Sequence, residues 1–338
     1  MKERLPRVLF VGCGEHGTGT LLPAVVSLGA ATVVGVCDAD AERAETTARR
    51  YAVPTAGTDV ERLLDELEPD AVVMAGPPQL HSNGGLAALE YGCDLFVEKP
   101  PGLVREDVEC LAAAARERAQ IGMVGHNLRY SAAWRHACEA ARGLGSIEHL
   151  TVSYHASGPT GSRWEEPPLV AFLLTHAIHV FDLMLSVIGP PRDARFHLKP
   201  YAGGRYVLSA ELASASGTVA TATVSTLAPR FVWMAEVLTS APSVIQVNSP
   251  AELIVHAPVR GESPWDRGRR ETWRTRSLDS GYDTAGYAAE LRAFFDAVET
   301  RQEVSPSFDD ELLVYDLVQE VLAQRQTAGD SGRLAVRL

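Results

Sequence analysis

Apolar and polar positions in the first third of the chain alternate between short apolar runs and longer amphipathic stretches. Strands that alternate with helices in this way are typical of a parallel sheet covered by helices on both faces. The predicted strands cover residues 7–11, 32–37, 71–75, 94–97 and 121–125, and helices are predicted between them at 41–51, 61–67, 82–90 and 105–119. The pattern therefore predicts an α/β fold that begins with a doubly wound parallel sheet.

The pattern changes beyond about residue 126. A predicted helix at 132–142 leads into a strand at 147–155, and a long apolar helix follows at 169–188. Further strand-like stretches then follow one another without helices, which favours an antiparallel sheet. These stretches are residues 206–213, 218–226, 233–239, 244–248 and 252–256, and helices at 284–300 and 309–326 close the chain. We therefore predict two domains, residues 1–126 and 127–338.

Composition argues against several classes of function. The 338 residues carry a formal net charge of -12, which argues against a surface for nucleic acid or anionic membranes. No apolar stretch approaches the roughly 20 residues of a membrane span, and the N-terminus has no secretory pattern. The five cysteines are scattered and never form a CxxC pair, so we expect a cytoplasmic protein with reduced thiols and no metal site.

A glycine-rich turn follows the first predicted strand. Gly12, Gly14 and Gly17 form a GxGxxG motif, in which glycines allow a tight turn, close approach of the backbone to a pyrophosphate, and close packing of helix on sheet. Asp38 ends the second strand about twenty residues later, where dinucleotide-binding folds place the acid that binds the adenosine ribose. The motif predicts dinucleotide binding with NAD(H) favoured, while Arg43 could reach back and leaves NADP(H) open.

Two later strand ends are expected to line the same crevice. Pro77 and His81 follow the third strand and are expected near the ribose or nicotinamide, although His81 equally fits a proline-stiffened turn with a helix cap. Lys99 is one of only three lysines and follows an apolar strand and Glu98. Because lysine is a compact cation, we expect Lys99 to polarise a reacting oxygen, with a salt bridge as the alternative. The predicted cofactor contacts are Gly12, Gly14, His16, Gly17, Asp38, Pro77, His81, Glu98 and Lys99.

The order and spacing of four motifs resemble the Gfo/Idh/MocA family, the glucose–fructose oxidoreductase and inositol dehydrogenase family. The motifs are the GxGxxG turn, Pro77-Pro78-Gln79-Leu80-His81, Glu98-Lys99-Pro100 and Asn127-Leu128-Arg129-Tyr130. The resemblance implies a Rossmann dinucleotide-binding domain at 1–126 and a substrate-binding and oligomerisation domain at 127–338, whose open sheet is largely antiparallel. It also implies NAD(P)-linked redox chemistry without a metal, often a cis proline at Pro100, and a homodimer or homotetramer packed through the open sheet.

The long apolar helix carries the residues that the resemblance assigns to the substrate. His179 falls on the family's catalytic histidine, and Asp182 falls on an acid three residues later. Thr175 stands where the family commonly has an earlier acid, so one expected carboxylate is absent. His176 is either a substitute proton donor or a core or interface histidine.

Lys99 and His179 are the predicted catalytic residues. A neutral histidine can exchange a hydroxyl proton near physiological pH, and an ammonium group stabilises a developing alkoxide. We therefore expect an oxidoreductase that transfers a hydride between NAD(P) and a sugar, cyclitol or related small polar carbonyl or alcohol. Arg129 and Tyr130 are candidate substrate contacts, with an interdomain salt bridge as the alternative for Arg129.

The altered helix favours a reductase in a specialised biosynthetic pathway, acting on a keto-sugar or an imine. A non-catalytic dinucleotide-binding sensor of the same fold is the alternative function. The presence of both Lys99 and His179 argues for the enzyme, whereas Thr175 argues for the sensor.

Overall fold

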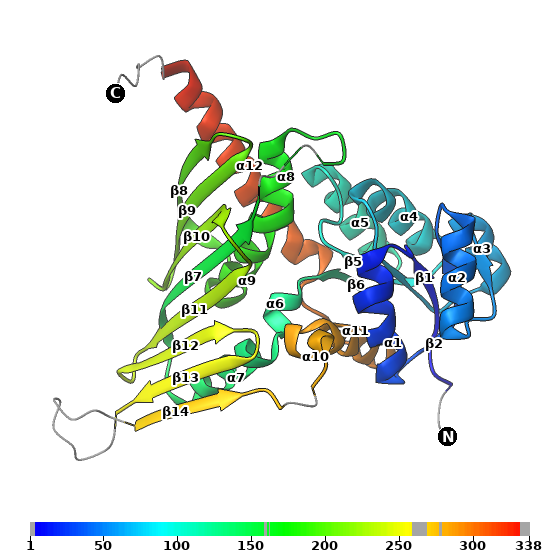
Figure 1. Ribbon diagram of the computed structural model, residues 1–338, viewed down its shortest axis with the longest axis horizontal. Coiled ribbons are helices and arrows are strands. Elements are labelled where there is room, and N and C mark those ends of the chain that lie inside the picture. The colour runs from blue at the N-terminus through cyan, green and yellow to red at the C-terminus, as the bar shows by residue number, and fades with distance from the viewer. Residues whose placement is uncertain (1–3, 159–160, 162, 259–268, 277–278, 332–338) are drawn as a thin grey trace. The chain divides into compact units, whose positions relative to one another are not determined.

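The computed structural model of the chain describes residues 4–158, 161, 163–258, 269–276 and 279–331 (Figure 1). Lys2 lies outside the described residues. The chain divides into two compact units. The first consists of Met1–Ala132 and Thr275–Leu312, and the second of Ala133–Arg274 and Leu313–Leu338.

The first unit contains a sheet of six parallel strands in the order β3-β2-β1-β4-β5-β6 (Figure 1). The chain moves outward from β1 to β3 and then returns to the other side of β1 for β4, β5 and β6. This order confirms the predicted doubly wound parallel sheet. The strands are β1 (Arg7–Val11), β2 (Thr32–Cys37), β3 (Ala56–Gly57), β4 (Ala71–Met74), β5 (Asp94–Glu98) and β6 (Gly122–Gly125).

Helices bury the central strands of this sheet. Val8, Leu9 and Phe10 are consecutive and fully buried, and because neighbouring side chains of a strand point to opposite faces, both faces of β1 are covered. The regular elements around the sheet are η1 (Gly17–Leu21, a π-turn), α1 (Leu22–Leu28), α2 (Ala41–Tyr51), α3 (Val60–Leu67), α4 (Pro78–Glu90), α5 (Arg105–Glu117), α6 (Asn127–Tyr130), α10 (Gly281–Ala285) and α11 (Tyr287–Thr300).

The division of the chain differs from the single boundary predicted at residue 126. Residues 127–132 and 275–312 belong to the first unit, although the sequence placed them in a second domain. The apolar face of α11 explains the difference, because Leu291 and Phe294 are fully buried in the same core cluster as Phe10 and Phe96. Helical periodicity predicts α11 but does not say which sheet its apolar face covers.

The second unit contains an eight-stranded sheet in the order β14-β13-β12-β11-β7-β10-β9-β8 (Figure 1). Only β7 and β10 pair in parallel, and the other neighbours are antiparallel, which confirms the predicted largely antiparallel sheet. The strands are β7 (Ile147–Ser157), β8 (Pro191–Tyr201), β9 (Arg205–Ser214), β10 (Val219–Ala228), β11 (Val232–Thr239), β12 (Ser243–Ser249), β13 (Glu252–Ala257) and β14 (Arg269–Arg274), and the helices are α7 (Ala132–Gly143), α8 (Pro168–Phe172) and α9 (Ile178–Ile188). Helix α12 (Phe308–Ser331) begins in the first unit and belongs to the second from Leu313 onward.

Two elements of this unit depart from the sequence prediction. Strand β8 contains Pro191 and Pro200 and was not predicted, but it lies at the edge of the sheet, where proline is tolerated because one row of backbone groups needs no partner. The predicted helix 169–188 is divided by a π-turn, η2 (Leu173–Ala177), into α8 and α9.

The sequence expectation that no apolar stretch approaches the length of a membrane span was wrong. The stretch Pro168–Ile188 is long and apolar enough to cross a membrane, the one such helical stretch in the described part of the chain. However, 78% of its most apolar window is buried within the protein. Helix α9 packs on β7, β9 and β10, as a core helix does.

We expect Phe96→Ala to lower the free energy of unfolding of the chain by about 3–5 kcal/mol, the usual cost of removing a buried phenyl ring. Phe96 is fully buried, and its ring meets that of Phe294 edge-on at 5.8 Å between centroids. Urea unfolding followed by circular dichroism measures the change. Val26→Ala is the control, because Val26 is 48% exposed, and a shift there as large as that of Phe96→Ala would contradict the assigned core.

Candidate functional site

The loops at the carboxyl ends of β1, β4 and β5 form the candidate cofactor site of the first unit. The order of the strands reverses between β1 and β4, and in open α/β sheets ligands bind in the crevice at such a reversal. The GxGxxG turn follows β1, the segment 76–81 follows β4, and Lys99 follows β5.

Two of the three glycines of the turn are required by close backbone contacts, and the third faces open space. Gly12 has a φ of +99°, and a Cβ atom there would lie 2.0 Å from the carbonyl oxygen of Ala75. A Cβ on Gly17 would lie 2.1 Å from the carbonyl oxygen of Gly12. Gly14 is different, because a Cβ there would meet nothing within 4 Å. The turn therefore has an open side at Gly14, as a loop that receives a pyrophosphate against its backbone requires.

Asp38 lies directly after β2 and is 9% exposed. Its Oδ2 accepts a hydrogen bond from the backbone N–H of Cys13 at 2.8 Å, and its Oδ1 accepts from the backbone N–H of Asp40 at 2.9 Å. The guanidinium of Arg43 donates to the same Oδ1 from Nε at 3.1 Å and from Nη2 at 2.8 Å. Burial alone would raise the pKa of Asp38, but these donors outweigh burial and hold the pKa below its usual value.

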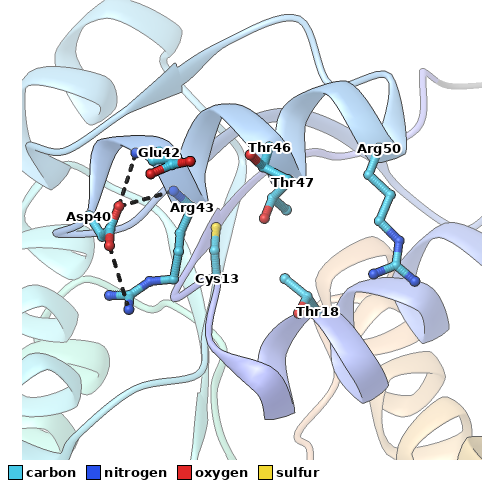
Figure 2. A pocket seen from close by; sticks show the side chains of 8 residues that line it. All are labelled: Cys13, Thr18, Asp40, Glu42, Arg43, Thr46, Thr47 and Arg50. Carbon is cyan, nitrogen blue, oxygen red and sulfur yellow. Dashed lines mark hydrogen bonds and ion pairs between the residues drawn. The ribbon is translucent and has the colours of Figure 1, made fainter.

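A pocket of about 310 Å³ lies between the glycine-rich turn and α2 (Figure 2), and two of the residues that line it, Cys13 and Arg43, donate hydrogen bonds to Asp38. Arg43 and Arg50 come from one helix, α2, and Thr18 of η1 lies on the opposite wall. Asp40 is engaged as the N-cap of α2, where its side chain accepts from the backbone N–H groups of Glu42 and Arg43. The pocket is therefore lined largely by polar side chains next to the predicted ribose contact.

Glu98 connects the glycine-rich turn to the strand that carries Lys99. The Glu98 side chain is buried, and its Oε1 lies 3.1 Å from Nε2 of His16. Its Oε2 accepts from the backbone N–H of Lys99 at 3.1 Å. Burial opposes charge on both partners, yet their mutual hydrogen bond and attraction raise the pKa of His16 and lower that of Glu98. The Lys99–Pro100 peptide bond is cis, as the resemblance led us to expect.

His81 holds the ends of two strands together. Its Nε2 accepts from the backbone N–H of Gly76 at 2.8 Å, so Nδ1 carries the proton and donates to the carbonyl oxygen of Pro100 at 2.9 Å. The side chain is fully buried, and burial lowers its pKa to about 4. Both ring nitrogens therefore bond to the protein's own backbone, which fits a positioning residue. Pro77 is the N-cap of α4 and is exposed.

Arg129 and Tyr130 lie in the short helix α6 and bond to the returning C-terminal segment of the same unit. Arg129 donates from Nη1 to Oγ of Ser305 at 2.8 Å, and the Tyr130 hydroxyl donates to the carbonyl oxygen of Ser305. Asn127 similarly donates to the carbonyl oxygen of Ala285 at 2.9 Å. These contacts give both predicted substrate residues a structural role within the first unit.

The predicted substrate residues of the second unit lie on η2 and α9. His179 is 8% exposed, and its ring stacks near that of Tyr154 with centroids 6.0 Å apart and planes at 22°. His176 approaches the same tyrosine at 5.8 Å and Phe172 at 6.0 Å. The structure thus brings both histidines to Tyr154, whose pKa is raised by burial.

Thr175 and Asp182 occupy different surroundings. Thr175 lies within the π-turn η2, where the sequence assumed a regular α-helix. A π-turn contains an extra residue and rotates the side chains that follow it, so spacing alone does not place Thr175 relative to His179. Asp182 lies one turn into α9 and is fully buried.

Sequence reasoning missed Tyr154 and Trp233 as residues of this region. They stand opposite each other on β7 and β11. Trp233 is 2% exposed, and its indole N–H has no hydrogen-bond partner within the described residues. The alternation of the predicted strands was the available signal, since Tyr154 is in phase with the buried Leu150 and Val152.

Comparison with known proteins places the fold and the first unit in a known group. Residues 6–126 match an oxidoreductase family with an NAD-binding Rossmann fold, GFO_IDH_MocA. The crystal structure of a dehydrogenase from Chromobacterium violaceum is 29% identical in sequence, covers 98% of this chain and 100% of that chain, and superposes with a TM-score of 0.89.

Two curated relatives match over shorter lengths. The chain is 25% identical to 4-carboxy-2-hydroxymuconate-6-semialdehyde dehydrogenase of Sphingobium sp., over 65% of this chain and 71% of that protein. It is 28% identical to scyllo-inositol 2-dehydrogenase (NAD(+)) of Bacillus subtilis, over 64% of this chain and 57% of that protein. These relatives are dehydrogenases of different compounds.

We expect Gly12→Ala to lower the stability of the protein and Gly14→Ala to weaken its binding of NADH. Gly12→Ala forces a Cβ against the Ala75 carbonyl and should lower the free energy of unfolding by about 2 kcal/mol or more. Gly14→Ala meets open space, so it should change stability by less than about 1 kcal/mol but weaken NADH binding about tenfold or more by filling the pyrophosphate side. Urea unfolding and fluorescence titration separate the two effects. Unchanged NADH affinity in folded Gly14→Ala would contradict this placement.

We expect His81 to make the protein less stable as the pH falls. The pKa of His81 is about 4 in the folded protein, and that of an unfolded histidine is about 6.5. Between these values the unfolded chain binds a proton that the folded chain does not, so up to roughly 3 kcal/mol of stability is lost as the pH falls. Unfolding of the wild type and His81→Gln at about pH 7.5 and about pH 4.5 tests this. The stability difference should narrow at the lower pH, and a difference independent of pH would contradict a neutral, buried His81.

Proposed function

Because the chain belongs to the Gfo/Idh/MocA oxidoreductase family, we propose that it is an NAD(P)-dependent oxidoreductase of a small polar carbonyl or alcohol. The substrate class is a sugar, a cyclitol or a related compound. The observation that carries the proposal is Lys99, a cation at the end of a buried parallel strand, held beside a glycine-rich turn through Glu98.

The first unit fits a dinucleotide on its own geometry. Gly14 leaves the backbone of the turn open, and Asp38 offers a buried carboxylate at the end of β2. We assign the pyrophosphate to the turn and the adenosine ribose to Asp38. The nicotinamide half is assigned to the loops that carry His16, Glu98 and Lys99. When bound, the dinucleotide accepts or donates the hydride of the reaction.

Lys99 and His179 are assigned the two polar roles of the reaction. The ammonium of Lys99 stabilises negative charge on the substrate oxygen as the carbon–oxygen bond order changes. The imidazole of His179 takes the hydroxyl proton in oxidation and returns it in reduction. Glu98 and His81 act as positioning residues for the Lys99–Pro100 peptide. Glu98 accepts from the backbone N–H of Lys99, and His81 donates to the carbonyl oxygen of Pro100.

The second unit supplies groups suited to a polar, ring-shaped substrate. His176 and His179 lie beside Tyr154, and imidazole groups bind hydroxyls as donor or acceptor. Tyr154 and Trp233 are 7% and 2% exposed, so they support this region from within the core. These features support a sugar or cyclitol substrate. Arg129, Tyr130, Thr175, His176 and Asp182 stay predicted substrate contacts.

The absence of a carboxylate at Thr175 favours a second candidate function, a dinucleotide-binding sensor without turnover. The two candidates share the cofactor site and differ in chemistry. Dinucleotide binding together with no turnover on a panel of sugars, cyclitols, keto-acids and imines would overturn the enzyme and favour the sensor. The cytoplasmic location and the homodimer or homotetramer stay predictions.

We expect Lys99→Met to lower kcat/KM on the best substrate of that panel by about 10²–10³-fold, the effect of removing one donor to a developing oxyanion. Nicotinamide absorbance measures turnover, and circular dichroism verifies folding. Lys199→Met is the matched control, because Lys199 lies on the edge strand β8 with its ammonium 5.1 Å from the Tyr201 ring. Full activity in a folded Lys99→Met protein would contradict the assignment of Lys99 as a catalytic residue.

A further inference from the structure

The hydrogen bonds of Asp38 bear on which dinucleotide the protein accepts. An ionised carboxylate has about four acceptor positions, and Asp38 already receives four donor contacts, two from backbone N–H groups and two from Arg43. Three of these contacts converge on Oδ1 and one reaches Oδ2, so a ribose hydroxyl at Oδ1 must displace or share with Arg43, while Oδ2 keeps one acceptor position. Asp38 is not the freely available acceptor that its sequence position suggests.

The charge of Asp38 is also balanced. A lone acid at the end of β2 selects NAD(H) because it repels the additional phosphate on the ribose of NADP(H). Here Arg43 Nη2 lies 2.8 Å from Asp38 Oδ1, and Arg43 Nη1 lies 3.8 Å from Asp40 Oδ2. An approaching ribose phosphate therefore meets an ion pair in place of an isolated carboxylate. The repulsion that would exclude NADP(H) is weaker as a result.

We propose that Arg43 enables this protein to bind NADP(H) as well as NAD(H), an inference that rests on the proposed dinucleotide site. The Arg43 side chain is 55% exposed, and its guanidinium can turn from Asp38 to a ribose phosphate. A guanidinium binds carboxylate and phosphate with the same two-pronged geometry, so Arg43 exchanges one anionic partner for another. Asp38 then keeps its bonds from Cys13 and Asp40.

The pocket between the glycine-rich turn and α2 supplies the space for this phosphate. It has a volume of about 310 Å³ and is lined by Arg43, Thr46, Thr47 and Arg50 of α2 and by Thr18 of η1 (Figure 2). The two guanidinium groups favour an anion, whereas the Thr18 hydroxyl donates to the carbonyl oxygen of Gly14 at 2.9 Å. Asp40 and Glu42 line the start of the same helix, and their charge explains why we expect NADP(H) to be accepted without being strongly preferred.

Equilibrium binding of NADH and NADPH to the full chain tests the proposal without any substrate. Fluorescence titration should give dissociation constants for the wild type that agree within about tenfold. Arg43→Gln should weaken NADPH binding by about tenfold or more, because a charge-assisted pair is lost, while NADH binding changes less than about threefold or becomes tighter as Asp38 is released.

Arg49→Gln is the matched control. Arg49 lies on the same helix, is 69% exposed, pairs with Glu45 at 3.6 Å and does not line the pocket. This variant should leave both dissociation constants unchanged. Equal weakening of both dinucleotides by Arg43→Gln, or wild-type binding of NADPH more than about a hundredfold weaker than that of NADH, would overturn the role of Arg43.

Competition by adenosine 2′,5′-bisphosphate and by ADP separates this proposal from the proposed function. Both probes lack the nicotinamide and report on the adenosine end alone. Arg43→Gln should weaken the 2′-phosphorylated probe selectively, and Lys99→Met should affect neither. If the wild type binds none of the two probes and two dinucleotides, both the proposed cofactor site and the role of Arg43 are contradicted. If binding is as expected but no turnover is found, only the enzyme is overturned.

Discussion

The backbone of Gly12 passes the carbonyl of Ala75 too closely for any side chain, and the cofactor site of the first unit depends on this contact. It brings the loop after β1 across the end of β4, the neighbouring strand. The backbone N–H of Gly12 also donates to the carbonyl of Cys37 at the end of β2, at 2.8 Å. One glycine thereby joins three strand ends, and the open position at Gly14 follows two residues later.

Three buried polar side chains then fix the loops around that turn. Asp38 is held by Cys13 and Asp40, Glu98 by Lys99 and His16, and His81 by Gly76 and Pro100. Burying such groups costs free energy unless they are hydrogen-bonded, and here backbone groups of the loops provide the partners. The hydrogen bonds that offset the cost of burying each side chain therefore also hold the loop that provides the partner. This keeps the loops of the site in one geometry.

Charge is distributed unevenly among these three groups. His81 is neutral because its surroundings offer one donor and one acceptor. In contrast, hydrogen bonds to Glu98 and Asp38 lower the pKa of each carboxyl despite its burial. Burial thus has different outcomes at the three groups. Burial lowers the pKa of His81 to about 4, whereas at Glu98 and Asp38 the hydrogen bonds from His16, Arg43 and backbone N–H groups outweigh the effect of burial.

Much of the architecture follows from the sequence alone, because strand and helix periodicity are local. The parallel strands, the antiparallel sheet, the glycine-rich turn and the position of Asp38 at a strand end can all be read from residue order. Tertiary structure decided what residue order does not encode. Residues 275–312 belong to the first unit because the apolar face of α11 packs in the core of that unit. The π-turn that contains Thr175 changes the direction of its side chain relative to that of His179. Arg43 occupies Asp38, and His81 bonds to Pro100, through contacts between side chains and loops whose relative positions only folding sets.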